Sequence, residues 1–297
     1  MLAEKKIGFI GGGNMGKALI GGLTASGLVR PENIICSDIC EKSLAATKAE
    51  YGINTTTSNA EAIQDAEIVI FATKPQILPA VLKETAGLLD KSRLIISIAA
   101  GVPLAAISLS AGKNLRLIRV MPNLCALVKE SATAIAAGEF VLDGDMELAR
   151  AIFDSVGTSV FLQEELLDAF TGLSGSGPAY MFMMLDALAD AGVKAGLSRE
   201  DSRLLSAQTM LGAAKMMLES GEHPGLLKDK VTSPGGTSIA GIQVLEQAGL
   251  RAAMIDCVEA ASDRSRELGC LTAEKFQDKP AQQGEGGIKR LMKVLFG

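Results

Sequence analysis

Ile7-Gly8-Phe9-Ile10-Gly11-Gly12-Gly13-Asn14-Met15-Gly16 decides the fold of the first half of this 297-residue chain. The first four residues form a short apolar run, typical of a strand, and Gly11–Gly16 fits the pattern G-x-G-x-x-G. Apolar residues then recur at helical spacing over Lys17–Gly27. A glycine turn between a strand and a helix lets a pyrophosphate approach the backbone, and the helix N-terminus favours its negative charge. The stretch therefore predicts a dinucleotide site in a Rossmann-type fold.

Further apolar runs continue this pattern as far as about residue 163. Continuous apolar runs are typical of strands that are buried on both faces. Because helical segments separate them, we expect an α/β domain over residues 1–163, with a doubly wound parallel sheet. The runs are Asn33–Ser37, Ile68–Ala72, Leu94–Ala99 and Arg116–Val120.

The second part of the chain has no strand pattern, and we expect an all-α domain over residues 164–271. Its long helical segments are Pro178–Ala195, Arg199–Glu219, Thr237–Ala248 and Arg251–Leu268. Residues 272–297 are predicted to form a polar linker and a short basic amphipathic tail, Ile288–Phe296. The tail is either a packed or frayed terminus, or a docking helix for a partner or an anionic membrane surface.

Composition excludes several classes of protein. The net charge is −5 and Trp is absent, which argues against a nucleic-acid partner. There is no 18-residue apolar run, so no membrane span is expected. No signal peptide is recognised, and the 5 cysteines form no C-x-x-C pair, so we expect reduced thiols in a cytoplasmic protein without a metal site. The mean hydropathy of +0.28 suggests large buried faces and an oligomer.

Asp38 follows the second strand, about 20 residues beyond the glycine turn. A carboxylate here accepts a hydrogen bond from the adenosine ribose and repels a 2′-phosphate, which favours NADH; alternatively, Asp38 caps the next helix.

Ligands of open α/β sheets bind beyond the carboxyl ends of the strands. Residues at those ends are Ala72, Thr73, Lys74, Pro75, Ala99, Ala100 and Asn123, the last a candidate amide for the nicotinamide, while Lys74 could equally be a solvent lysine.

Two Gly/Ser-rich turns mark the helical part, Gly172–Tyr180 and Thr232–Ser238. Each could be no more than a tight entry to a helix. The second presents backbone N–H groups over Ser233–Thr237 at a helix start, which suits a substrate carboxylate, and the hydroxyls of Thr237 and Ser238 could bond a ring nitrogen. The single histidine, His223, precedes a proline and is interpreted as a turn residue. The sequence shows no Ser/His/Asp arrangement for acid–base catalysis. Hydride transfer to a C=N bond is a reaction that needs little from side chains, because the cofactor carries out the difficult step.

The chain resembles the Δ1-pyrroline-5-carboxylate reductase family over residues 5–271. The resemblance is carried by Gly8–Gly11, Thr73–Gln76, Ala99–Val102, Leu173–Tyr180 and, most specifically, Lys228–Ile239. It implies a Rossmann domain followed by an all-α dimerisation domain, and a homodimer that often assembles into a ring of dimers, a decamer. It also implies reduction of the cyclic imine 1-pyrroline-5-carboxylate to L-proline with NADPH or NADH, the last step of proline biosynthesis.

The same resemblance implies the site residues. Cofactor contacts would fall on Ile10, Gly11, Gly12, Gly13, Asn14, Met15, Asp38, Asn59, Ala72, Thr73, Lys74, Pro75, Ile98, Ala99 and Ala100. Substrate contacts would fall on Val231, Ser233, Gly235, Gly236, Thr237 and Ser238. The hydroxyl of Ser238 or Thr237 would face the ring nitrogen as the catalytic group.

The sequence departs from the family pattern at several points. Leu124-Cys125 stands where the family usually has Thr-Pro, and Asp38-Ile39 replaces the pairs linked to NADPH use. Gly221 stands where some members have a glutamate, with Glu222 beside it. Two other functions remain open: a related dehydrogenase acting on another cyclic imine or a hydroxy acid, and a nucleotide-sensing or scaffold protein recruited through its tail.

Overall fold

Strand β1 (Ile7–Ile10) lies inside an eight-stranded sheet with the order β3-β2-β1-β4-β5-β6-β7-β8. The expected doubly wound parallel sheet is confirmed, with one exception: β7 runs antiparallel to β6. Only a short 3-10 turn, η2, joins these two strands, whereas parallel neighbours need a longer crossover. The other strands are β2 (Ile34–Ser37), β3 (Asn54–Thr56), β4 (Ile68–Phe71), β5 (Leu94–Ser97), β6 (Arg116–Met121), β7 (Ser131–Ala137) and β8 (Gly157–Phe161), and η2 spans Leu124–Val128.

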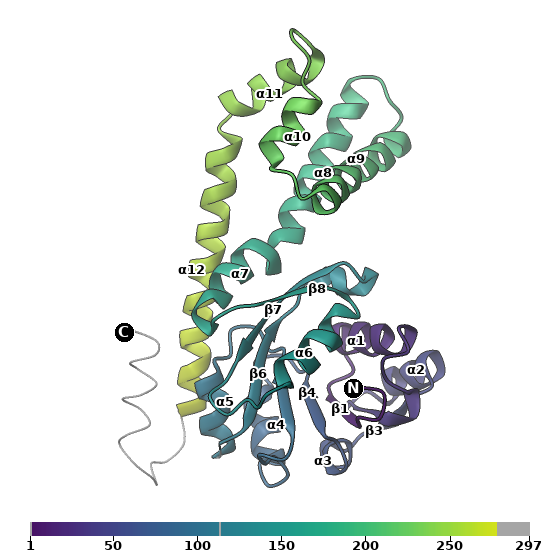
Figure 1. The fold of residues 1–297 in the computed structure, drawn as a ribbon, viewed down its shortest axis with the longest axis vertical. Helices are drawn as coiled ribbons and strands as arrows, with labels where there is room; N and C mark the ends of the chain where they lie inside the picture. The colour runs from purple at the N-terminus through teal and green to yellow at the C-terminus, as the bar shows by residue number, and fades with distance from the viewer. Residues whose placement is uncertain (1, 113, 278–297) are drawn as a thin grey trace. The chain divides into compact units, whose positions relative to one another are not determined.

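Helices cover both faces of this sheet (Figure 1). Side chains alternate along β1, so that Phe9 joins the core on one face and Ile10 the core on the other. The first core includes residues of α1, α2 and α6, and the second includes residues of α3, α4 and α5. These helices are α1 (Asn14–Ala25), α2 (Glu41–Tyr51), α3 (Asn59–Gln64), α4 (Leu78–Thr85), α5 (Leu104–Ala111) and α6 (Asp145–Asp154).

The computed structural model describes residues 2–112 and 114–277 and divides into two units. Of the described residues, unit 1 comprises those up to Gly175 and those from Ala261 onward, and unit 2 comprises Ser176–Ala260. The tail Ile288–Phe296 and the linker predicted before it from Asp278 lie outside the described residues. After β8 the chain is helical, as expected: η3 (Glu164–Leu166), α7 (Leu167–Phe170), a π-helical turn η4 (Thr171–Gly175), α8 (Gly177–Lys194), α9 (Arg199–Ser220), α10 (Pro224–Lys230), α11 (Thr237–Gln247) and α12 (Leu250–Gln277).

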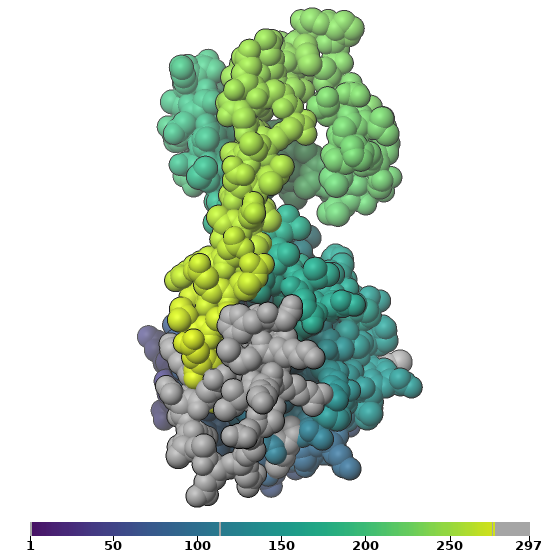
Figure 2. Space-filling model, turned by 90° about the vertical axis from the view of Figure 1, so that its left-hand side faces the viewer, coloured from purple at the N-terminus to yellow at the C-terminus, as the bar shows by residue number. Residues whose placement is uncertain are grey.

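The last part of α12 belongs to unit 1. There Ser265 donates a hydrogen bond of 2.6 Å to Asp168 of α7, and a Cβ on Gly269 would lie 3.4 Å from the carbonyl oxygen of Gly101. Phe276 is buried in the second core. The helix therefore extends beyond Leu268, where the sequence predicts its end, because its last turns still bury an apolar side chain. Figure 2 shows this part of α12, in yellow, along one side of unit 1.

Unit 2 has almost no interior of its own. Of residues 176–260, all of which the structure describes, only Gly177, Ala189 and Ser202 are buried. Helices α8 and α9 pack closely where Gly192 meets Ser202, since a Cβ on Gly192 would lie 2.6 Å from the Ser202 hydroxyl. Within the described part of the chain, no helix combines the length and the apolar character that a membrane crossing needs.

Candidate functional site

The glycine turn after β1 requires glycine at its first and last positions. Gly11 has φ of 108°, and a Cβ there would lie 2.8 Å from the carbonyl oxygen of Ala72. A Cβ on Gly16 would lie 2.5 Å from the carbonyl oxygen of Gly11. Gly11 N–H also donates to the carbonyl oxygen of Ser37 at 2.8 Å, which ties the turn to the end of β2. The turn thus lies against the ends of both neighbouring strands.

The start of α1 is open to a ligand. Gly13 is the N-cap, no side chain caps the helix, and no acidic residue lies in its first turn. A Cβ on Gly13 would have no atom within 4 Å, so the backbone can be approached closely there. The first N–H groups of a helix lack partners within the helix, and together with its dipole they attract an anion. This arrangement suits a pyrophosphate.

Asp38 is held by the backbone on both sides. Gly12 N–H donates to Asp38 Oδ2 at 2.7 Å, and Cys40 N–H donates to Asp38 Oδ1 at 2.9 Å. Asp38 does not cap the next helix: Cys40 is the N-cap of α2, and no side chain caps it. The next residue, Ile39, is 94% exposed. The carboxylate is therefore fixed beside the glycine turn, with a hydrophobic residue following it.

Asn59 lies at the same end of the sheet, as the first residue of α3. The Ser37 hydroxyl donates to Asn59 Oδ1 at 2.8 Å. Asn59 Nδ2 in turn donates to the two carboxylate oxygens of Glu84, on α4, at 3.2 and 3.4 Å. The resemblance alone identified Asn59, and Glu84 was missed because a lone acidic residue on a helix surface carries no motif.

The ends of β4 and β5 carry the remaining predicted cofactor residues. Thr73 Oγ1 is buried and has no hydrogen-bond partner among the described residues, while Lys74 is exposed. Ala99 is buried, and Ile98 and Ala100 are more open. A buried polar atom without a partner is uncommon in a folded protein, and a ligand group bound there would supply the missing hydrogen bond. Together with the open glycine turn, it indicates that these residues fit a dinucleotide.

Asn123 is placed differently from the other residues of this group. It is 8% exposed and caps η2, since its Oδ1 accepts from Cys125 N–H at 3.1 Å. Its Nδ2 donates to the carbonyl and hydroxyl oxygens of Ser174 at 3.2 and 3.1 Å. The side chain expected to meet the nicotinamide is thus engaged by protein groups at both ends.

The predicted substrate turn lies in unit 2, between α10 and α11. Gly236 N–H donates to the carbonyl oxygen of Ser233 at 3.0 Å, and Gly235 has φ of 66°. Gly236 is the N-cap of α11, whose first residue is Thr237, and no side chain caps this helix. The predicted contacts Val231, Ser233 and Gly235 are exposed, as is Thr237, while Gly236 and Ser238 are half-buried. The turn and the predicted hydroxyls therefore come together at one open helix start.

Two other features of unit 2 lie near this turn in the sequence. His223 caps α10, a helix the sequence reading missed, and its Nδ1 accepts from Gly225 N–H at 3.1 Å. Glu222 pairs with Lys230 at 2.6 Å. No group of three or more His, Cys, Asp or Glu side chains within residues 2–112 and 114–277 could hold a metal ion.

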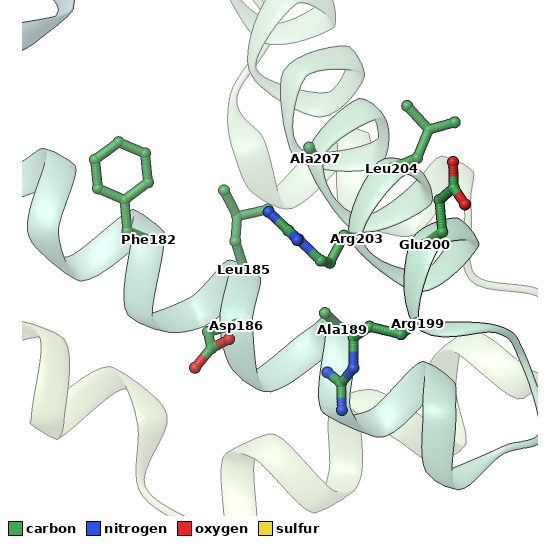
Figure 3. A pocket seen from close by; sticks show the side chains of 9 residues that line it. All are labelled: Phe182, Leu185, Asp186, Ala189, Arg199, Glu200, Arg203, Leu204 and Ala207. Atoms are coloured by element: carbon green, nitrogen blue, oxygen red, sulfur yellow. The ribbon is translucent and has the colours of Figure 1, made fainter.

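A separate hollow of about 780 Å³ lies between α8 and α9 (Figure 3). Apolar side chains such as Phe182, Leu185 and Leu204 line it together with the charged side chains of Asp186 and Arg203. None of its lining residues is a predicted cofactor or substrate residue.

Comparisons with known proteins agree with this arrangement. Residues 164–268 match the family model for pyrroline-5-carboxylate reductase dimerisation, and residues 6–101 match that for NADP oxidoreductase, coenzyme F420-dependent. The pyrroline-5-carboxylate reductase of Methanosarcina acetivorans is 49% identical over 268 residues, which cover 90% of this chain and 99% of the relative.

Solved structures give the same result. A pyrroline-5-carboxylate reductase from Coxiella burnetii has a TM-score of 0.86 and 38% identity, over 89% of this chain and 98% of that one. The Plasmodium falciparum enzyme, solved with NADP bound, has a TM-score of 0.81 and 33% identity, over 91% of this chain and 100% of that one. An N-terminal NADP-binding oxidoreductase domain is thus followed by a helical dimerisation domain, and the chain belongs to the pyrroline-5-carboxylate reductase family.

Proposed function

We propose that this member of the family reduces 1-pyrroline-5-carboxylate to L-proline, with unit 1 holding a nicotinamide cofactor and unit 2 holding the substrate. The observation that carries the proposal is the start of α11, where an uncapped helix N-terminus adjoins two hydroxyls, those of Thr237 and Ser238. A small ring that bears a carboxylate and an imine nitrogen needs an anion site and a neighbouring hydrogen-bonding group, and this turn offers both.

The substrate carboxylate is assigned to the backbone N–H groups of Gly235, Thr237 and Ser238, since Pro234 has none and that of Gly236 donates to the Ser233 carbonyl oxygen. Thr237 and Ser238 begin α11, and N–H groups in the first turn of a helix lack partners within the helix. Gly235 gives the turn its left-handed residue, and a Cβ on Gly236 would lie 2.3 Å from the Ser233 hydroxyl. A preorganised set of donors binds the anion without reordering the chain.

Ser238 or Thr237 is assigned to the ring nitrogen. When bound, the reduced nicotinamide would supply the hydride that adds to the imine carbon, and the ring nitrogen would take its proton from solvent water. Within the described residues neither hydroxyl has a hydrogen-bond partner, so either is free to orient the nitrogen and to stabilise the charge on it. Positioning and electrostatic stabilisation are the contributions that such a reaction requires of the protein.

The cofactor preference is assigned to Asp38. Its carboxylate lies beside the glycine turn, where the adenosine ribose of a dinucleotide binds in this fold, and it can accept a hydrogen bond from a ribose hydroxyl. A 2′-phosphate at the same position would meet a like charge. Among the described residues Asp38 has no ion-pair partner that would offset this repulsion. We therefore propose that, within this NADP oxidoreductase-type domain, NADH is preferred to NADPH.

The exposed apolar surface of unit 2 supports a homodimer. Met183, Leu204, Leu218 and Ile255 are between 66% and 83% exposed, although they lie on helices of a dimerisation domain. Large apolar side chains that are exposed in number on one domain favour a protein interface there. A ring of dimers, a decamer, is the larger assembly that we propose from the family resemblance.

The decisive experiment compares loop variants in a reductase assay with 1-pyrroline-5-carboxylate and either cofactor. The double variant Ser238→Ala, Thr237→Val should lower kcat by at least about tenfold, because it removes both hydroxyls from the reacting nitrogen. Thr232→Val is the matched control, since that hydroxyl already donates to the carbonyl oxygen of Lys228 at 2.7 Å. An unchanged kcat in the double variant would exclude the assignment, and nucleotide binding without turnover in the parent protein would exclude the reaction.

A further inference from the structure

The carboxyl end of β2 begins a chain of hydrogen bonds that ends on α4. Ser37 is fully buried, and its hydroxyl donates a hydrogen bond of 2.8 Å to Asn59 Oδ1. Asn59 Nδ2 lies 3.2 and 3.4 Å from the two oxygens of Glu84. The chain thus joins three elements, β2, α3 and α4, directly beside Asp38.

Glu84 decides which way the Asn59 amide faces. A carboxylate only accepts hydrogen bonds, whereas a hydroxyl both donates and accepts. The Ser37 hydroxyl could therefore donate to Asn59 Oδ1 or accept from Asn59 Nδ2. If it accepted from Nδ2, its own proton could go to the carbonyl oxygen of Phe9, which is more distant at 3.3 Å. A turned amide would place Asn59 Oδ1 against the Glu84 carboxylate, where two acceptors repel. With Glu84 present, Oδ1 faces Ser37 and Nδ2 faces α4.

Glu84 also adds charge to this end of the sheet. Asp38 follows Ser37 directly in the sequence, so the hydrogen-bonded chain from Ser37 through Asn59 to Glu84 begins at the residue before the Asp38 carboxylate. In residues 2–112 and 114–277, neither carboxylate takes part in an ion pair within 4.0 Å. A phosphate monoester carries a charge of about −1.5 to −2 at neutral pH, whereas a ribose hydroxyl carries none.

We propose that Glu84 is a positioning and specificity-determining residue, which orients Asn59 and disfavours a 2′-phosphate on the bound dinucleotide. This inference rests on the proposed function, in which the adenosine ribose lies beside Asp38. Glu84 itself need not touch the cofactor: it acts through the Asn59 amide and through its charge.

The test is Glu84→Gln, measured by direct titration of the full-length protein with NADPH and with NADH in the absence of substrate. Glutamine keeps the side-chain length, removes the charge and lets the Asn59 amide turn. The ratio of the Kd for NADPH to the Kd for NADH should fall at least about threefold, because a like charge at this range is partly screened by solvent and salt. Steady-state kinetics should show the same change in the KM ratio, with a smaller change in kcat.

Glu147→Gln on α6 is the matched control, since it removes one exposed carboxylate from unit 1 without touching β2, α3 or α4. It should leave the ratio unchanged. If Glu84→Gln also leaves the ratio unchanged while Asp38→Ser lowers it, the ribose site stands and the inference about Glu84 is wrong. If neither variant moves the ratio, the proposed ribose site itself fails, and the inference with it.

Discussion

The side-chain nitrogen of Asn123 lies 3.2 Å from the carbonyl oxygen of Ser174 and 3.1 Å from its hydroxyl oxygen. These bonds hold the start of the Gly172–Tyr180 motif against the end of β6. Gly175 packs there too, since a Cβ on it would lie 3.0 Å from Cε of Met121. The π-helical turn over Thr171–Gly175 therefore docks on the sheet through one buried amide and one glycine contact.

Asn123→Asp tests whether this amide is an anchor. Aspartate can still accept from Cys125 N–H, but it cannot donate to Ser174 and would place a negative charge against its carbonyl oxygen. We expect the free energy of unfolding to fall by about 1–3 kcal/mol, the usual cost of a buried polar group that loses its partner. Chemical denaturation of the variant and of the parent protein measures it.

Ser174→Ala is the companion variant for this prediction. It removes only the hydroxyl and keeps the carbonyl oxygen, so its loss of stability should be smaller than that of Asn123→Asp. If Asn123→Asp instead weakens nucleotide binding without any loss of stability, Asn123 contacts the nicotinamide, as its place at a strand end predicts.

Gly11→Ala should weaken cofactor binding. The substitution forces a side chain into a left-handed conformation, with φ of 108°, and places its Cβ 2.8 Å from the carbonyl oxygen of Ala72. Moving the turn costs about 1–3 kcal/mol, which corresponds to a rise in the Kd for NADH of about 5- to 150-fold. Fluorescence titration with NADH checks it.

Gly27→Ala separates this effect from ordinary glycine strain. Gly27 also has a positive φ, of 68°, but a Cβ there would have no atom within 4 Å, and it follows the far end of α1. This variant should lose about 1 kcal/mol of stability and keep the Kd of the parent protein. Equal effects of both variants on Kd would contradict a specific role for the turn at Gly11.

Leu204→Glu should break up the assembly. Leu204 is 66% exposed and lines the hollow between α8 and α9, so a buried interface at this point would have to accept a carboxylate without a partner. Sedimentation should show a dimer or larger species for the parent protein and a smaller species for the variant. Leu109→Glu, on an exposed position of α5 in unit 1, should keep the parent mass. A variant at Leu204 that keeps the parent mass would place the interface elsewhere.

Periodicity and glycine spacing predicted the Rossmann domain well. The apolar runs that end at Ser37, Ala72 and Ala99 closely match β2, β4 and β5, because strands buried on both faces leave a continuous apolar signal. The short edge strand β3 was not predicted. It has only three residues, none of them buried, and such a strand leaves no pattern of its own.

The hydrogen-bond partners within the site could not be predicted in the same way. Asn123 was correctly placed at a strand end, but its partner Ser174 is 51 positions away and lies in a separate motif. Glu84 is likewise 25 positions from Asn59. Such pairs form only when the sheet brings distant segments together, and local spacing carries no trace of them. Strands β7 and β8 were not predicted either, and the antiparallel direction of β7, which the short connection after β6 allows, was therefore not foreseen.

Thiol labelling should distinguish Cys36, which lies within β2, from Cys40, which is the N-cap of α2. Cys40 is exposed, whereas Cys36 is buried, and burial together with the nearby charge of Asp38 raises the pKa of the Cys36 thiol to about 12. The thiolate is the reactive form, so iodoacetamide at mildly alkaline pH should modify Cys40 in the folded protein and reach Cys36 only on unfolding.

The raised pKa of Cys36 also predicts how stability changes with pH: the free energy of unfolding should fall as the pH rises. An unfolded Cys36 ionises near 9.0, well below its folded value, so deprotonation favours the unfolded state as the pH rises from 9.0 toward about 12. The Cys40→Ser variant leaves Cys36 in place. In this variant, labelling of Cys36 should be slow and should become faster with denaturant and with alkaline pH. Mass spectrometry of peptides measures both sites, and rapid modification of Cys36 in the folded protein at neutral pH would show that β2 opens to solvent.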